Sequence, residues 1–469
     1  MRIRFIRHCG DSRNCVFRHC VVGIIALLFC TISAQAAKPA KTFEMVLKEL
    51  QKSGTQVSAQ VVNLTNTRDI LSVNADHALN PASSIKLFTA YVALKRLGID
   101  YQFKTEVYQN PDQSVCVKGS GDPSFVMEDL YLLVEGLKRR GLESYSGKIL
   151  LDTTVFDSDY YPDGRSDQDS ERAYNAPISG LNFNYNTVTV FVNPTEKGKP
   201  ARVGTDYSFD FLKFHSNVVT TSGATNVSWG KKGSVVSLGG KINVNADEWH
   251  KPFRIADPER GWGQALATMF ETLGVKAKGK VKISDGTCLG KPLFTDTSPP
   301  LSFIVQLMDK YSNNFIADTL VKTLDHEVNH HPGTAKGGLK YIRDQLEEIG
   351  IHADQKGRKF VVGSGLTRGN AMSASDFIHL LKTINHEKLF LPEIFASLPI
   401  AGIDGTLKRR YLRSEVAERL RAKTGTLNGV QSLVGIYPNR DGEWIGIAVI
   451  TNGSKGIPEV ALAKYLNSL

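Results

Sequence analysis

The sequence predicts an α/β protein in which an antiparallel sheet flanked by helices is interrupted by a large β-rich insertion. Two observations lead to this prediction. Both ends of the chain carry amphipathic helical segments next to strands of apolar residues. Residues 103–297 instead carry short β-like runs separated by turns rich in Gly, Asn, Asp and Pro. We therefore expect residues 37–102 and 298–469 to form one split domain, and residues 103–297 to form one or two inserted domains.

The segment before the insertion predicts a helix, a hairpin and a second helix. Residues 42–54 have helical periodicity, and residues 56–64 and 70–74 are strand-like runs joined by a polar turn. The second helix is expected to start at Pro81 and to end at Gly98, a residue type that is common just after helices.

The segment after the insertion predicts the same ingredients again. Helical patterning returns in residues 300–327, 337–350 and 373–385. Residues 430–453 predict an antiparallel meander, and residues 458–469 predict a final helix laid against it. The two ends of the chain can therefore share one sheet.

Residues 1–36 have the features of a secretory signal peptide. An arginine-rich start precedes the apolar run Val21 to Ser33, and an A-x-A site ends at Ala36. The run is short for a bilayer span, so we expect cleavage after Ala36 and export of a soluble product to the periplasm or another extracytoplasmic compartment. The leader carries five arginines and one aspartate, so its removal lowers the formal net charge from +10 to +6.

The remaining positive charge has two interpretations. It supports a loose association with an anionic polymer of the cell envelope, or it belongs to an ordinary solvated surface. No run of arginines with interleaved aromatic residues indicates a nucleic-acid partner. Beyond the leader the sequence has two cysteines, Cys116 and Cys288, which form either one disulfide or two unpaired buried thiols.

A zinc-peptidase motif stands in the second half of the chain. His326, Glu327 and His330 have the H-E-x-x-H spacing, which on a helix places two imidazoles on one face with a glutamate beside a metal-bound water. Pro332 ends that helix directly after the motif.

The surroundings of this motif argue against a metal site. The position of the expected third ligand is Lys336, although Glu347 or Glu348 could serve instead. Lys322 and Thr323, one turn before the first histidine, indicate a solvated helix face. We therefore expect no metal and no other cofactor, and keep a zinc metallopeptidase as the weaker alternative.

Three other short motifs fall in the split domain, and the first contains Ser83 and Lys86. A serine three residues before a lysine shares a helix face with it, so the amine can accept the hydroxyl proton. The lysine must be neutral for this, which requires burial or nearby positive charge. Alone, this spacing occurs by chance in many helices.

The second motif is Ser312-Asn313-Asn314, at the start of a predicted helix. The ordinary interpretation is a helix N-cap. The functional interpretation is a hydroxyl that relays a proton to a leaving group, together with an amide that holds the substrate carbonyl and the lysine.

The third motif is Lys423-Thr424-Gly425-Thr426, on a predicted strand. The lysine and the hydroxyls suit a carboxylate, and Gly425 lets a ligand backbone approach closely. A backbone N–H beside Thr426 and that of Ser83 together suit an oxyanion hole.

The three motifs in this order resemble those of class A β-lactamases and penicillin-binding proteins. The stretches "GKILLDTTVF", "GSGLTRGN" (363–370) and "LPIAGIDGTL" (398–407) extend the resemblance over the mature chain. The chain thus resembles the penicillin-recognising serine D-alanyl-D-alanine peptidases, specifically the class C low-molecular-mass penicillin-binding proteins of the penicillin-binding protein 4 type. The resemblance implies the serine β-lactamase/DD-peptidase fold.

The spacing of the motifs favours a peptidase over a β-lactamase. Ser83 and Ser312 are 229 residues apart, much farther than in β-lactamases of this fold, and the E-x-x-L-N motif of class A enzymes is absent. Residues 311–313 do match the Y-x-N motif of class C β-lactamases, so a β-lactamase or related serine hydrolase stays an alternative. A non-catalytic wall-binding protein is a third alternative, although such a protein needs no activated serine.

The resemblance implies an acyl-enzyme mechanism on peptidoglycan stem peptides, and covalent capture of β-lactams. Ser83 is the implied nucleophile, Lys86 the base and Ser312 the proton relay. The implied substrate-binding residues are Asn314, Lys423, Thr424, Gly425, Thr426 and Arg368. For Arg368, which is expected to meet a carboxylate of the stem, the alternative is a solvated turn arginine. Release of free D-Ala makes a carboxypeptidase, and release of a cross-linked side chain makes an endopeptidase.

Overall fold

The computed structural model describes residues 42–166, 170–388 and 390–469. The signal peptide predicted for residues 1–36 lies outside these described residues. Within the described part, no helix is both long enough and apolar enough to cross a membrane.

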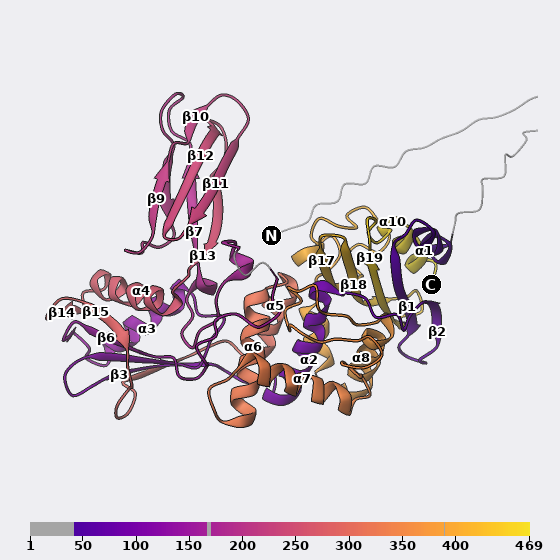
Figure 1. The fold of residues 1–469 in the computed structure, drawn as a ribbon, viewed down its shortest axis with the longest axis horizontal. Coiled ribbons are helices and arrows are strands. Elements are labelled where there is room, and N and C mark those ends of the chain that lie inside the picture. The colour runs from indigo at the N-terminus through magenta and orange to yellow at the C-terminus, as the bar shows by residue number, and fades with distance from the viewer. Residues whose placement is uncertain (1–41, 167–169, 389) are drawn as a thin grey trace, which may run out of the picture. The chain divides into compact units, whose positions relative to one another are not determined.

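An antiparallel sheet of five strands brings together the two ends of the described chain (Figure 1). Its strand order is β17-β18-β19-β1-β2, in which β1 (Gln56–Asn63) pairs with β19 (Trp444–Asn452). The other strands are β2 (Asp69–Val73), β17 (Arg421–Leu427) and β18 (Val430–Pro438). The hairpin and the meander predicted from the sequence are thus parts of one sheet.

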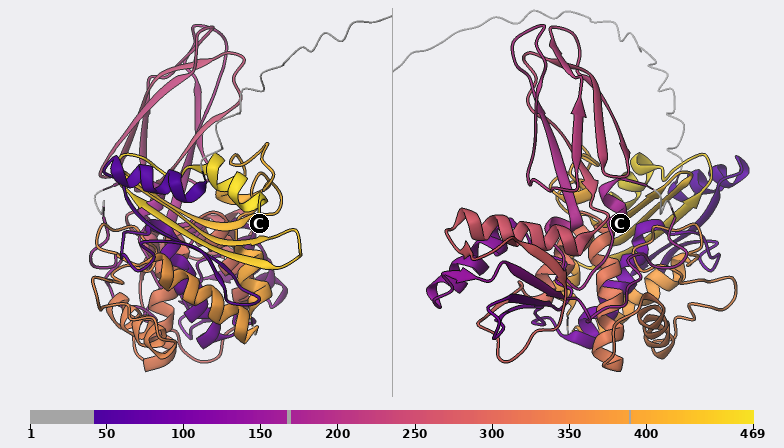
Figure 2. Two further views of the ribbon diagram at one scale, coloured as in Figure 1. Left: turned by 90° about the vertical axis from the view of Figure 1, so that its right-hand side faces the viewer. Right: turned by 60° about the vertical axis from the view of Figure 1, so that its left-hand side comes forward.

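Helices cover both faces of this sheet (Figure 2). Successive strand residues point to opposite faces, so alternate apolar residues pack in opposite directions. One set packs with α1 (Phe43–Lys52) and α10 (Glu459–Asn467). The other packs with α8 (Ala374–Glu387) and the helices beyond it.

A cluster of helices centred on α2 (Lys86–Leu97) forms the larger core on this second side. Every residue of α2 from Lys86 to Leu94 is buried, as expected for a helix that is apolar on nearly all sides. The surrounding helices are α5 (Leu301–Lys310), α6 (Asn314–Asn329), α7 (Ala335–Glu348) and α9 (Leu391–Ser397). The predicted fold class, an antiparallel sheet flanked by helices with a β-rich insertion, is confirmed.

The chain between α2 and α5 contains a second five-stranded sheet, of order β15-β6-β4-β3-β16. Its strands are β3 (Lys104–Gln109), β4 (Val115–Gly119), β6 (Lys148–Asp152), β15 (Lys282–Asp285) and β16 (Phe294–Thr297). Helices α3 (Met127–Arg139) and α4 (Pro258–Thr272) pack against this sheet. The β-like runs did not predict either helix, although α3 buries Leu130, Leu133 and Leu137 at helical spacing.

Shorter strands make up the rest of the insertion. Strand β7 (Thr187–Asn193) lies between β8 (Arg202–Thr205) and β13 (Trp249–Arg254). The other short strands are β5 (Ser144–Tyr145), β9 (Lys213–Ser216), β10 (Val219–Thr221), β11 (Asn226–Lys232), β12 (Val235–Asn243) and β14 (Lys276–Ala277). Single 3-10 turns occur at η1 (Ala82–Ile85), η2 (Ala173–Asn175), η3 (Asn184–Asn186) and η4 (Gly405–Leu407).

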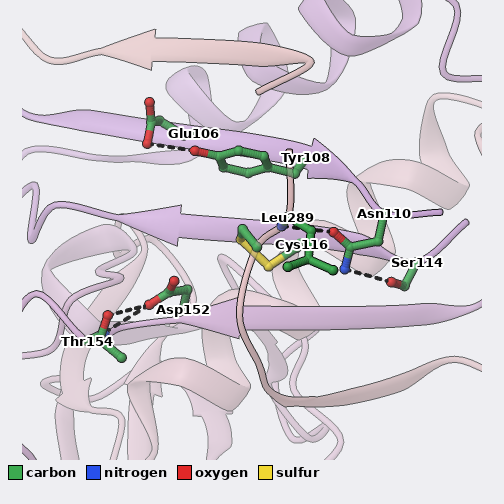
Figure 3. Close-up of a disulfide and its surroundings, with 9 residues drawn as sticks. Glu106, Tyr108, Asn110, Ser114, Cys116, Asp152, Thr154 and Leu289 are labelled. Carbon is green, nitrogen blue, oxygen red and sulfur yellow. Dashed lines mark hydrogen bonds between the residues drawn. A yellow bond between two sulfur atoms is a disulfide. The ribbon is translucent and has the colours of Figure 1, made fainter. Parts of the chain in front are cut away.

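A disulfide joins Cys116 on β4 to Cys288 in the loop before β16 (Figure 3). The side chain of Asn110 accepts a hydrogen bond from the backbone N–H of Leu289 (3.2 Å) beside it. The structure therefore decides between the two alternatives for these cysteines. The cross-link spans 172 residues of sequence, and it stabilises the fold by restricting the unfolded chain.

Candidate active site

A tight turn positions Ser83 directly before helix α2. The sequence predicts an α-helix from Pro81, but the structure has a 3-10 turn (Ala82–Ile85) there. The side chain of Asn80 braces this turn by accepting a hydrogen bond (2.8 Å) from the residue before Ser83. Residues three apart eclipse each other in a 3-10 turn, and Ser83 Oγ lies 3.1 Å from Lys86 Nζ.

The terminal nitrogen of Lys86 is enclosed by three oxygen atoms. Its Nζ lies 3.1 Å from Ser83 Oγ, and donates to Asn314 Oδ1 (2.7 Å) and to the carbonyl of Ser364 (2.5 Å). The side chain is completely buried. Elements distant in sequence therefore meet at this amine, and Figure 1 shows α2 beside α6 and near β17.

Burial and four charged groups set the protonation of Lys86. Burial lowers the pKa of Lys86 well below its usual value, and the positive charges of Lys423 and Arg165 lower it further. The carboxylates of Asp318 and Asp309 act in the opposite direction and raise it. Burial also lowers the pKa of Lys423 to about 8 and raises that of Asp309 to about 6. The environment thus favours a neutral Lys86 amine, which is the form that accepts a proton.

Ser312 lies within reach of the second buried lysine. Lys423 Nζ donates to Ser312 Oγ (2.8 Å), and Lys423 is completely buried. The N-cap of α6 is Asn313 and not Ser312, so the serine hydroxyl is left for the lysine. Asn314, the first residue of α6, points its amide oxygen at the other lysine, Lys86.

Strand β17 runs directly past the Ser83 turn. A Cβ atom on Gly425 would lie 3.0 Å from the backbone nitrogen of Ser83. The hydroxyl of Thr424 donates to Thr406 Oγ1 (2.7 Å) in η4, and the side chain of Thr426 is exposed. The structure therefore brings the three motifs together at one site.

Replacement of Gly425 by alanine is expected to slow the acylation by penicillin that the sequence resemblance implies, at least about tenfold. The new methyl group would lie 2.3 Å from the carbonyl oxygen of Pro81, so β17 must move away from Ser83, at a cost of about 1–3 kcal/mol. Gly230→Ala is the control, because this strand glycine has no atom within 4 Å of an added Cβ. Equal labelling rates for the two variants would contradict the expectation.

The site also contains groups that the sequence reasoning missed. Asp318 accepts a hydrogen bond from the N–H of Ser364 (3.0 Å), and the carbonyl of Tyr174 accepts one from Asn314 Nδ2 (3.3 Å). Asp318 had a usable signal, because it lies one helical turn after Asn314 on the same face of α6. Tyr174 had none, because it belongs to the insertion and lies 140 residues away in sequence.

Arg368 lies outside this group of buried contacts. Its side chain is exposed, and Nη1 donates to the carbonyl of Asn428 (2.7 Å) in the turn after β17. Its contact with a substrate carboxylate therefore stays a prediction.

The zinc-peptidase motif does not form a metal cage. Helix α6 ends at Asn329, and His330 adopts a left-handed conformation (φ 56°) that leaves the helix. His326 Nδ1 contacts the carbonyl of His331 (2.7 Å), and Glu327 accepts a hydrogen bond from a tyrosine hydroxyl (2.8 Å). Across the described ranges, no group of three His, Cys, Asp or Glu side chains could hold a metal ion.

One argument about this helix was wrong. Lys322 and Thr323 do not lie on a solvated face, because both are buried. The ammonium of Lys322 pairs with Asp157 (2.5 Å) and donates to the carbonyl of Asp159, both in the insertion. Helical periodicity alone could not reveal that a distant loop covers this face.

The chain is similar to known proteins over most of its length. Residues 40–464 match the family described as the D-Ala-D-Ala carboxypeptidase 3 (S13) family. A D-alanyl-D-alanine carboxypeptidase of Actinomadura sp. (strain R39) is 29% identical over 449 residues, covering 89% of this chain and 82% of that protein. D-alanyl-D-alanine carboxypeptidase DacB of Haemophilus influenzae is 27% identical over 419 residues, covering 85% and 86%.

Solved structures show the same relationship. The crystal structure of penicillin binding protein 4 (dacB) from Haemophilus influenzae superposes with a TM-score of 0.76 at 25% identity, covering 90% of this chain and 98% of that one. A second crystal structure of that protein, complexed with a β-lactam, has a TM-score of 0.70 at 23% identity.

The fold and these comparisons define a serine-type peptidase, a hydrolase. The chain belongs to the D-Ala-D-Ala carboxypeptidase 3 (S13) family. The resemblance to penicillin-binding protein 4 inferred from the sequence motifs is confirmed.

Proposed function

We propose that Ser83 is the nucleophile and Lys86 the base of this D-alanyl-D-alanine peptidase. The observation that carries the proposal is the contact between Ser83 Oγ and Nζ of the buried Lys86 (3.1 Å), made where burial and a second lysine favour the neutral amine. Ser83 Oγ bonds to the carbonyl carbon of the penultimate D-Ala, and its proton passes to Lys86 Nζ.

Ser312 and Lys423 assist departure of the leaving group. Lys423 Nζ donates to Ser312 Oγ, so the serine can pass a proton to the leaving nitrogen as the C–N bond breaks and regain one from the lysines. The proton that Lys86 took from Ser83 replaces the one that Ser312 gave up, so Lys86 is neutral again. Water then attacks the ester carbonyl and gives up a proton to Lys86, which passes it to Ser83 Oγ as the ester C–O bond breaks.

The strand motif binds the substrate in this proposal. Thr424 and Thr426 hold the terminal carboxylate beside Lys423, and Asn314 orients the substrate carbonyl. The N–H groups of Ser83 and Thr426 stabilise the oxyanion. This role is supported by the short approach of Gly425 to the backbone of Ser83. Arg368 is proposed to meet a carboxylate on the peptide stem.

The same chemistry serves two substrates. When the leaving group is free D-Ala the enzyme is a carboxypeptidase, and when it is the side-chain amine of a cross-linked residue the enzyme is an endopeptidase. A β-lactam presents a strained amide to Ser83, and its acyl-enzyme keeps the leaving nitrogen attached. We propose covalent β-lactam capture for this chain as well, supported by the relative that was crystallised with one.

Two further parts of the proposal concern organisation and location. The catalytic domain comprises residues 37–102 and 298–469, with residues 103–297 inserted; the shared sheet of β1 and β19 supports this division. The enzyme acts outside the cytoplasm, which is supported by the arginine-rich start and A-x-A site of residues 1–36.

The test is to label the mature protein with a fluorescent penicillin, with and without a zinc chelator, and to map the adduct by mass spectrometry. We expect one adduct on the peptide that contains Ser83, unchanged by the chelator and absent from Ser83→Ala. Loss of peptidase activity with the chelator, together with activity that survives in Ser83→Ala but not in His326→Ala, would assign the reaction to the zinc motif instead.

A further inference from the structure

A buried ion pair connects the insertion to the helix that carries Asn314. Arg165, in the loop between β6 and η2, lies with its Nε atom 3.8 Å from Asp318 Oδ2 on α6, and both side chains are 0% exposed. Neither of these two atoms makes a hydrogen bond within the described part of the chain. The attraction between them is therefore ionic, and each charge is the counterion of the other inside the protein.

Two separate chains of polar contacts connect Arg165 with the amine of Lys86. In the first, Asp318 accepts a hydrogen bond from the N–H of Ser364 (3.0 Å), and the carbonyl of that same residue accepts one from Lys86. In the second, the carbonyl of Tyr174 accepts hydrogen bonds from Arg165 Nη2 (2.9 Å) and from Asn314 Nδ2 (3.3 Å). The amide oxygen of Asn314 then accepts from Lys86 (2.7 Å).

The charge of Arg165 can act on Lys86 because Arg165, Asp318 and Lys86 are all buried, where charges are weakly screened. The groups that act on Lys86 are Lys423 from β17, Asp309 from α5, Asp318 from α6 and Arg165 from the insertion. Asp318 alone would hold the ammonium form of Lys86, which cannot accept a proton. A guanidinium next to Asp318 offsets that carboxylate, and guanidinium stays charged at all ordinary pH values.

We propose that Arg165 is a positioning residue for Lys86: it offsets the charge of Asp318 and holds Tyr174 against Asn314, so that the amine stays free to take the proton of Ser83. The insertion thereby takes part in the reaction, although it contributes none of the three sequence motifs. This inference rests on the proposed roles of Ser83 and Lys86.

The effect of removing the guanidinium has a definite sign. Acylation requires neutral Lys86, so its rate falls on the acid side of the pKa of that amine. In Arg165→Gln, Asp318 still attracts the ammonium form of Lys86, but the guanidinium that opposed this attraction is gone. Asn314 and Ser364 still accept hydrogen bonds from Lys86. The pKa of Lys86 rises, and the acid limb of the rate profile moves to higher pH. In Asp318→Asn it moves to lower pH.

The experiment measures the rate of labelling by fluorescent penicillin as a function of pH. We expect the midpoint of the acid limb to rise by about one pH unit in Arg165→Gln, with a roughly tenfold slower rate below the midpoint. Arg165→Lys should restore most of the midpoint because it keeps the charge. Asp318→Asn should lower the midpoint, and the double variant should return it toward the wild-type value.

Lys322→Gln is the matched control. Lys322 is also a buried cation at the contact between α6 and the insertion, one turn after Asp318, but its partner is Asp157. We expect it to lower the unfolding temperature without moving the midpoint. If Arg165→Gln and Lys322→Gln lower stability alike and leave the midpoint unchanged, Arg165 is only a structural residue and the proposal is wrong.

Two outcomes separate this proposal from the one on which it rests. If Arg165→Gln does not fold, the proposal is tested with Arg165→Lys and Asp318→Asn instead. An unchanged midpoint of the acid limb in Asp318→Asn then refutes the proposal. If the wild-type protein is labelled without dependence on Ser83, the proposed function fails first. Labelling that depends on Ser83, with the same midpoint in every variant, refutes only the role of Arg165.

Discussion

Replacing Lys86 by methionine is expected to slow acylation by penicillin about 10²- to 10⁴-fold, because Ser83 then lacks the group that we propose takes its proton. Methionine has a similar length and no charge. The measurement is the time course of labelling by fluorescent penicillin. Lys95→Met is the matched control, since Lys95 is an exposed lysine of the same helix, and it should label within about twofold of wild type. A Lys86→Met rate within tenfold of wild type would mean that another group is the base.

Thermal unfolding separates loss of the base from loss of the fold. Burial lowers the pKa of Lys86 in the folded chain, so between its folded and unfolded pKa values the unfolded state binds more protons. This group therefore opposes folding at low pH, and the effect is lost as the pH rises toward the unfolded pKa. At pH 7 we expect Lys86→Met to unfold at a temperature no lower than wild type, with a difference that shrinks at alkaline pH.

Replacing Gly338 by alanine is expected to lower the unfolding temperature by roughly 5 °C or more. Gly338 is the point where α7 crosses α6, and a Cβ atom there would lie 1.8 Å from the carbonyl oxygen of Val321. The two helices must separate, and overpacking of this kind typically costs about 1–3 kcal/mol and at times more. Because α6 also carries Asn314 and Asp318, we expect penicillin labelling to slow as well.

A second helical glycine provides the control for Gly338. Gly261 on α4 has its nearest neighbour 3.5 Å from an added Cβ, an ordinary contact. Gly261→Ala is expected to be neutral or to stabilise the protein by up to about 1 kcal/mol, because alanine favours helix more than glycine does. If both variants have the same unfolding temperature, the close crossing of α6 and α7 does not limit stability.

Much of the fold could be predicted because most of its strands and helices have recognisable local sequence patterns. The hairpin of β1 and β2 and the meander of β18 and β19 are strand-like apolar runs joined by polar turns, and the helices of the last third of the chain have clear periodicity. Helices α3 and α4 escaped notice because they are embedded among short strands. The 3-10 turn that carries Ser83 also differs from the predicted α-helix, since sequence patterns resolve helix starts poorly.

Some residues of the candidate site could likewise be predicted from the sequence, and others could not. Ser83 and Lys86 could be paired from sequence, because their separation of three residues is a local property. The meeting of Lys86 with Asn314 could be inferred only through resemblance, since the two residues are 228 positions apart in the sequence. Asp318 was within reach of periodicity, whereas Arg165 and Tyr174 had no local signal.

The sequence by itself predicted which side chains would carry the chemistry, the class of fold and the large insertion between the first two motifs. Only the tertiary structure decided that Cys116 is bonded to Cys288, that Lys322 is buried and that Arg165 is the counterion of Asp318. The physical reason is the range of the interactions. Periodicity and motif spacing record contacts between neighbours in the chain, whereas burial and ion pairing depend on which distant loop covers a surface.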